Sequence, residues 1–218
     1  MKLASLFAIS FTLTAGTAQA LEEQPESCRL ISSGNGAIAV PYTDADAQLQ
    51  CDIDRAQLVS ERARDIFGDS PSPIITIVDT KSPSGTAYVY DISDVSGTMM
   101  LDARSVPGMQ NTASPVPPCR LQTQLPENVA NKAALSLLFA AEPDIPAYGT
   151  RQKMVVNTDG SRSYELLLSS HDIITHIETV EGQRDFSRHA DATDKIADLN
   201  RSVIGVANFS DGWVCNTN

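Results

Sequence analysis

The segment between residues 73 and 106 constrains the fold most, because it reads as three strands joined by short connections. The first run, "PIITIVD" at 73–79, is rich in β-branched residues and is typical of a buried strand. Two further strand-like runs, at 85–93 and 96–106, meet at "DVSG" (94–97), which has the composition of a turn. Consecutive strands joined by short turns pair antiparallel, so we expect an antiparallel sheet.

Three other segments carry the helical period. Apolar residues recur at three- and four-residue steps in 43–67, in 126–142 and in 187–209. Gly68 suits the end of the first helix, and Pro126 suits the first turn of the second. The second helix has apolar residues on most faces, which predicts that it is well buried. Three helices with six or seven strands joined by short turns predict an α+β fold with a mainly antiparallel sheet.

Further strands are expected in the C-terminal half. The segment 151–170 reads as a hairpin, because Asp159 and Gly160 lie between two strand-like runs and form a strong two-residue turn signal. The next segment, "SSHDIITHIE" at 169–178, is expected to continue it as a third strand.

The first 20 residues are typical of a secretory signal peptide. Lys2 gives a positive start, an apolar run covers 3–15, and the "AQA" at 18–20 fits the small-x-small rule for cleavage. The apolar run is shorter than the roughly 20 residues that cross a bilayer, although a buried N-terminal helix is an alternative. We expect a periplasmic or secreted protein with no membrane insertion after cleavage.

The mature chain is then 21–218, expected as a single α+β domain that is stabilised by disulfides. A Pro- and Ser-rich loop at 107–118 is where a division into two lobes would fall. Removing Lys2 lowers the 16 basic residues to 15 against 27 acidic residues, a net charge of −12. This acidic balance disfavours nucleic acid as a partner.

The mature chain has four cysteines: Cys28, Cys51, Cys119 and Cys215. An even count in an oxidising compartment predicts two disulfides, for which three pairings exist. We favour Cys28–Cys51 and Cys119–Cys215, because the first two lie close in sequence. No C-x-x-C motif occurs, so a redox catalyst or a zinc knuckle is poorly supported.

Two histidines make the segment 169–178 the strongest polar candidate for a site. On a strand, the five-residue offset places His171 and His176 on opposite faces, so the two cannot share a metal ion. His176 does share a face with Glu178. His171, His176 and Glu178 are therefore polar site candidates, and an ordinary solvated strand face is the alternative.

No established catalytic or cofactor motif occurs elsewhere. The sequence lacks G-x-S-x-G, S-x-x-K and P-loop patterns. The "GNGAIA" at 34–39 resembles a dinucleotide fingerprint, but no strand precedes it and Pro41 interrupts the helix that should follow. We assign no catalytic, metal-binding or cofactor-binding residue and expect no cofactor. Tyr88, Tyr90 and Trp213 could line a binding surface, although partial burial in the core is more usual.

These features favour a non-catalytic exported protein that acts as a binding or accessory module of the bacterial cell envelope, with a protein or small-molecule partner. One alternative is a secreted hydrolase whose catalytic residues are dispersed along the chain and include His176 or His171. Another is a secreted inhibitor or effector that acts through the loop at 107–118.

Overall fold

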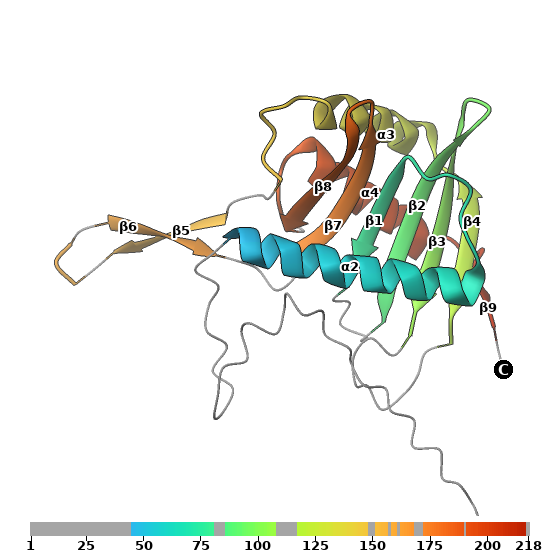
Figure 1. Ribbon diagram of the computed structural model, residues 1–218, viewed down its shortest axis with the longest axis horizontal. Coiled ribbons are helices and arrows are strands. Elements are labelled where there is room, and N and C mark those ends of the chain that lie inside the picture. The colour runs from blue at the N-terminus through green and yellow to red at the C-terminus, as the bar shows by residue number, and fades with distance from the viewer. Residues whose placement is uncertain are drawn as a thin grey trace, which may run out of the picture.

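Figure 1 shows the protein as a computed structural model. The structure describes residues 45–80, 86–107, 117–147, 151–156, 158–160, 162–167, 172–189 and 191–216. The predicted signal peptide, Cys28 and His171 lie outside these residues, as does most of the loop at 107–118.

A seven-stranded sheet forms the centre of the molecule, with the strand order β8-β7-β1-β2-β3-β4-β9. Every neighbouring pair in it is antiparallel, which confirms the predicted α+β fold with an antiparallel sheet. The strands are β1 (Ile75–Asp79), β2 (Ala87–Val95), β3 (Thr98–Val106), β4 (Cys119–Gln124), β7 (Asp172–Thr179), β8 (Gly182–His189) and β9 (Val214–Cys215).

Helices cover the sheet on both faces. Helix α2 (Ala45–Phe67) crosses one face, and α3 (Glu127–Ala140) and α4 (Lys195–Asn208) lie on the other (Figure 1). Each interface has its own apolar core. The α2 core contains Ala56, Val59, Ala63, Val78, Val89 and Ile174, and the α3/α4 core contains Ile77, Tyr90, Leu101, Phe186, Ile196 and Leu199.

Two predicted turn signals act as expected. Gly68 follows the last residue of α2, with a φ of 79°, and its N–H donates to the carbonyl oxygen of Arg64 at 2.7 Å. This is a common way for glycine to end a helix. Between β2 and β3, Ser96 and Gly97 have φ values of 54° and 84°. Two consecutive positive φ angles are typical of the two-residue turn that joins twisted antiparallel strands.

The last helix begins later than the sequence pattern predicts. Instead of a helix over 187–209, residues up to His189 belong to β8, and α4 starts at Lys195. Asp194 sets this start, because its carboxylate accepts a hydrogen bond from the Ala197 N–H at 2.9 Å. His189, which the expected helix would include, is consequently a half-buried residue of β8.

The hairpin is confirmed, although its neighbour is different from the one expected. Strands β5 (Arg151–Val156) and β6 (Arg162–Leu167) pair with each other in a separate two-stranded sheet. Their connection is longer than the two-residue turn that was predicted. Strand β7 does not join this hairpin, because it pairs with β1 and β8 in the main sheet.

Helix α3 is less buried than predicted. Its buried face consists of Val129, Ala133, Ser136 and Ala140, which are mostly small residues at helical spacing. Leu138 is 70% exposed and Leu135 is also exposed. The fully buried face of α3 is narrow, and Leu137 and Phe139 pack against the core while remaining partly exposed. Apolar residues on most faces therefore do not make this helix central.

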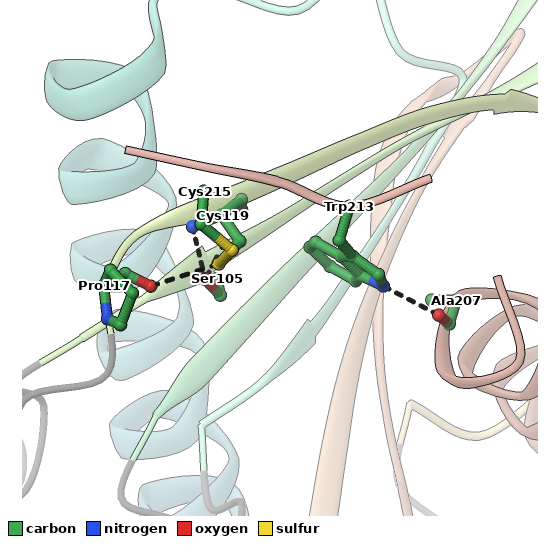
Figure 2. Close-up of a disulfide and its surroundings, with 6 residues drawn as sticks. All are labelled: Ser105, Pro117, Cys119, Ala207, Trp213 and Cys215. Atoms are coloured by element: carbon green, nitrogen blue, oxygen red, sulfur yellow. Dashed lines mark hydrogen bonds between the residues drawn. A yellow bond between two sulfur atoms is a disulfide. The ribbon is translucent and has the colours of Figure 1, made fainter. Parts of the chain in front are cut away.

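The C-terminal segment is fixed to the edge of the sheet by a disulfide. Cys119 on β4 and Cys215 on β9 are bonded, as predicted (Figure 2). Nearby, Trp213 donates its indole N–H to the Ala207 carbonyl oxygen at 2.8 Å and packs edge-on against Tyr88. Cys51 is also disulfide-bonded and fully buried, and its predicted partner lies outside the described residues. Among the described helices, none is long and apolar enough to cross a membrane.

Candidate functional site

A line of polar residues crosses the face of the sheet that α2 covers. Strand register places Asp185, His176, Thr76, Asp91 and Asp102 side by side, on β8, β7, β1, β2 and β3 in turn. Directly opposed residues on antiparallel strands point to the same face. The line therefore runs beneath α2, where burying a polar group is unfavourable unless it finds a partner.

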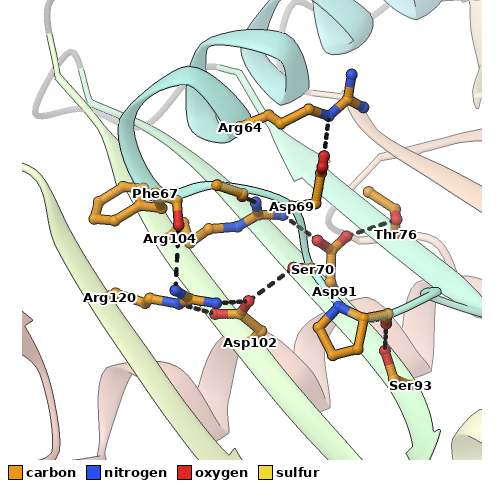
Figure 3. A network of polar contacts seen from close by, with 12 residues as sticks. Arg64, Phe67, Asp69, Ser70, Thr76, Asp91, Ser93, Asp102, Arg104 and Arg120 are labelled. Atoms are coloured by element: carbon orange, nitrogen blue, oxygen red, sulfur yellow. Dashed lines mark hydrogen bonds and ion pairs between the residues drawn. The ribbon is translucent and has the colours of Figure 1, made fainter.

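Two ion pairs satisfy one end of this line (Figure 3). Asp91 accepts from the Thr76 hydroxyl at 2.6 Å and forms an ion pair with Arg104. Asp102 accepts two hydrogen bonds from Arg120, from Nε and Nη2, each at 2.8 Å. Such bidentate contacts are the stronger type of ion pair.

The same two arginines also hold the C-terminal end of α2. Arg120 donates to the Phe67 carbonyl oxygen at 3.3 Å, and Arg104 donates to the Gly68 carbonyl oxygen at 3.4 Å. Burial alone would raise the pKa of Asp102. Hydrogen bonds from Arg120 and Ser70, together with the arginine charges, nevertheless hold that pKa below its usual value. Every charged group here already has a protein partner, so this end of the line is structural.

The other end of the line is the pair His176 and Asp185. The imidazole Nδ1 lies 2.7 Å from Oδ1 of Asp185, which also accepts from the Gln183 amide at 2.8 Å. Burial would raise the pKa of Asp185, but the hydrogen bonds from His176 and Gln183 lower it below its usual value. An ionised carboxylate only accepts, so the proton on Nδ1 points to Asp185. In the neutral ring this leaves the lone pair on Nε2, which has no hydrogen-bond partner among the described residues.

His176 lines a pocket of about 450 Å³ between α2 and the β1–β7–β8 side of the sheet, which we call the His176 pocket. Helix α2 supplies one wall with Gln57, Ser60, Glu61 and Arg64. The facing wall comes from the sheet and its approach, with Thr76, His176, Glu178 and Gln183 beside Pro73 and Ile74. The volume is in the range of small-molecule sites.

The polar groups of the His176 pocket are unevenly satisfied. Arg64 is paired with Asp69 at 3.1 Å, as His176 is with Asp185. Glu61 and Glu178 line the pocket as well, and neither forms an ion pair with another described residue. The Ser60 hydroxyl oxygen is buried and has no hydrogen-bond partner in the described part of the chain. A buried unsatisfied group calls for an explanation, and a missing ligand is one.

Two of the three predicted site candidates come together in this pocket. His176 and Glu178 both line it, and they share a strand face as expected. The partner of His176, however, is Asp185 and not Glu178. His171, the third candidate, lies outside the described residues. Asp185 and Gln183 were not identified from the sequence, because Phe186 is the only large apolar residue of 182–189 and the register with β7 that brings them to His176 is a contact between strands.

The predicted aromatic residues are elsewhere, on the opposite face. Tyr90 is buried in the α3/α4 core, and Tyr88 and Trp213 pack against that core. Burial raises the pKa of Tyr90 well above its usual value, with smaller contributions from Asp79 and Tyr88. These rings are therefore part of the core, which was the more usual alternative.

The described residues include no group of three or more His, Cys, Asp or Glu side chains that could hold a metal ion. Chemically, the His176 pocket can accept and donate hydrogen bonds, and its glutamates can attract a cationic group. It also contains His176, an imidazole base that Asp185 orients. Comparison with models of protein families, with curated proteins and with solved structures finds no match to this chain.

Proposed function

We propose that the protein is an exported, non-catalytic binding or accessory protein of the bacterial cell envelope, and that the His176 pocket is its ligand site. The observation that carries this proposal is the convergence of polar side chains from α2, β1, β7 and β8 on one cavity of about 450 Å³. Concave sites with a few converging polar groups are the usual form of small-molecule sites.

The location in the envelope is part of the proposal. It is supported by the signal-like composition of residues 1–20 and by the Cys119–Cys215 disulfide, since disulfides persist in oxidising compartments. Cell fractionation followed by N-terminal sequencing of the native protein tests it. A chain that starts at Leu21 in the envelope or culture fluid is expected, and a chain that starts at Met1 in the cytosol would contradict the proposal.

Ligand binding is tested by screening the mature protein against small polar compounds, with a rise in melting temperature as the readout. Two variants decide whether binding occurs in the pocket. Gln57→Trp places an indole in its α2 wall, whereas Asp65→Trp adds the same side chain at an exposed α2 position outside the pocket lining. Compounds that raise the melting temperature of the wild type and of Asp65→Trp should not raise that of Gln57→Trp. If no class of compound shows this pattern, the pocket is not a ligand site.

A hydrolase is the second candidate, and the contact between His176 and Asp185 favours it. A carboxylate that orients the imidazole of a pocket-lining histidine is the arrangement of a general base. In this reading Nε2 of His176 would take a proton from an attacking water molecule or from the Ser60 hydroxyl. The proton would then pass to the leaving group of an ester or amide.

Assays of the mature protein against ester and amide panels test this second candidate. His176→Gln and Asp185→Asn should both lower any activity at least about 100-fold if Nε2 acts as a general base, because such catalysis is usually worth that much. His189→Gln is the matched control, since His189 lies on the neighbouring strand and outside the pocket lining. Equal losses in all three variants, or no measurable activity in the wild type, would remove the hydrolase reading.

A further inference from the structure

The two basic side chains of the His176 pocket, Arg64 and His176, already have acidic partners in the protein. Arg64 Nε lies 3.1 Å from the Asp69 carboxylate, and His176 Nδ1 lies 2.7 Å from Asp185. Both acids are outside the pocket lining. An anionic ligand would therefore have to compete with an existing partner at either position.

The negative groups of the pocket are not neutralised in this way. Glu61 on α2 and Glu178 on β7 come from the two walls that face each other across the pocket. Both residues are exposed, and neither has an ion pair with any other described residue. The whole chain carries a net charge of −11, which adds to the attraction of cations toward this cleft.

The rest of the lining fits the body of an aliphatic amine. Pro73 and Ile74 offer an apolar surface to methylene groups. The amide oxygens of Gln57 and Gln183 can accept from an ammonium N–H. The Ser60 hydroxyl oxygen is buried and lacks a partner among the described residues, so it accepts from an entering N–H only after its side chain rotates.

We propose that the His176 pocket binds a small aliphatic diamine or polyamine, with one ammonium group at Glu61 and another at Glu178. This inference rests on the proposed function and names the ligand class of the same site. Two carboxylates on opposite walls favour a ligand with a positive charge at each end over one with a single charge. An anionic ligand is disfavoured by the same two groups, and a neutral polyol gains nothing from them.

Calorimetric titration of the mature protein with 1,4-diaminobutane and with spermidine tests the proposal. 1,4-Butanediol, which has the same carbon chain without charge, and 4-aminobutyrate, which has one charge of each sign, serve as ligand controls. Binding of the two amines is expected at low ionic strength and should weaken as salt rises, because exposed charges are screened. The diol and the zwitterion should bind much more weakly or not at all.

Charge-removing variants then locate the amine. Glu61→Gln and Glu178→Gln should each weaken diamine binding by up to about five-fold, the upper end for a single exposed ion pair, and the double variant should weaken it more than either single variant. Asp65→Asn is the matched control, since it removes one negative charge from an exposed α2 position outside the pocket lining. Its affinity should stay close to that of the wild type. All three substitutions are at exposed positions, so unchanged melting temperatures are expected without ligand.

Several results would overturn the proposal. Equal weakening by Asp65→Asn would show that amines bind only to the general negative charge of the surface. Binding of the diol as tight as that of the diamine would show that the charges are not recognised. If the diamine fails while another compound stabilises Asp65→Trp but not Gln57→Trp, the ligand class is wrong and the proposed function stands. If no compound of any class discriminates between those two variants, the proposed function fails with it.

Discussion

The ion pair between Asp91 and Arg104 should be the most sensitive electrostatic contact of the described residues. Their side chains are 4% and 5% exposed, respectively, beneath the C-terminal half of α2 (Figure 3). Among the described residues, the other side chain that bonds to Asp91 is Thr76, whose hydroxyl donates to it at 2.6 Å. Replacing Arg104→Met keeps much of the side-chain volume but leaves the Asp91 carboxylate buried with a single neutral donor.

The expected loss of stability is large. Removing one member of a buried ion pair costs about 3–5 kcal/mol, because the remaining charge has neither water nor a counter-charge. The free energy of unfolding of a domain is about 5–15 kcal/mol, so this is a large fraction of the total. For a chain of this size the melting temperature should fall by about 6–20 °C. Urea unfolding with the disulfides intact, followed by circular dichroism, measures the change.

A second variant tests whether the isolated charge is the cause. In Asp91→Asn/Arg104→Met both charges are absent, and the asparagine oxygen still accepts from Thr76. This double variant should recover at least half of the loss, because a neutral pair is much less costly to bury than a single charge. A loss below about 1 kcal/mol in Arg104→Met, well under the usual cost of an unpaired buried charge, would refute the reasoning. So would a double variant no more stable than the single one.

The partly exposed neighbouring pair is the matched comparison. Arg120 and Asp102 have side chains that are 28% and 9% exposed, so water can reach the carboxylate once the arginine is gone. Arg120→Met should therefore cost clearly less than Arg104→Met, although the arginine makes two hydrogen bonds to Asp102 at 2.8 Å. If Arg120→Met were the more damaging variant, burial would not be what determines the cost.

Three further predictions concern the disulfide, the pH dependence and one turn. Replacing both Cys119 and Cys215 with serine should lower the free energy of unfolding by about 4–5 kcal/mol, because the bridge spans 96 residues. The fluorescence emission of the single tryptophan, Trp213, should shift to longer wavelength. Unchanged emission would mean that the packing of Trp213 does not depend on the disulfide. The lowered pKa of Asp102 adds stability that is fully present above the ordinary aspartate pKa of about 3.9 and is lost as pH falls from there through the lower folded pKa. The free energy of unfolding of Asp102→Asn should therefore fall less steeply on acidification than that of the wild type. Equal slopes for the two proteins would contradict this. Gly97→Ala should cost about 1–2 kcal/mol in urea unfolding, because the φ of 84° is strained for any residue with a Cβ, and a neutral result would mean that the turn rearranges.

Local patterns were sufficient to predict the fold class. The strand-like runs before and after the turn at 94–97 became β1, β2 and β3, and the helical period of 43–67 became α2. The Cys119–Cys215 pairing was also correct. Each of these features depends on residues close in sequence or on the small number of pairings that four cysteines allow.

Features that depend on distant contacts were mispredicted or missed. The helix expected over 187–209 gave way to β8 in its first residues, because pairing with β7 outweighs the local helical pattern there. Arg188 is an example, since it is a charged residue but is fully buried, donating to the Ala147 and Pro146 carbonyl oxygens and pairing with Asp194. No local pattern predicts that a buried arginine will find three partners from other segments.

The candidate site could be predicted only in part for the same reason. His176 and Glu178 were identifiable, because a strand places them on one face. The pocket itself needs α2 to lie over β7, and Asp185 reaches His176 only through the strand register. A search of the sequence for acids near the histidine would have chosen Glu178, which lies two residues away along the same strand.

The two faces of the sheet explain why a site would form on the α2 side. Along β2, Tyr90 and Ile92 point into the apolar α3/α4 core, whereas Asp91 and Ser93 alternate with them on the α2 face. Two helices cover the apolar face and one covers the polar face. Beneath the end of α2, the arginines of β3 and β4 neutralise the buried acids. Near β7 and β8, the arginine that lines the His176 pocket is Arg64, and it already forms an ion pair with Asp69. Glu61 and Glu178 line the His176 pocket without an ion pair to any other described residue, and their negative charge favours a ligand that carries positive charge.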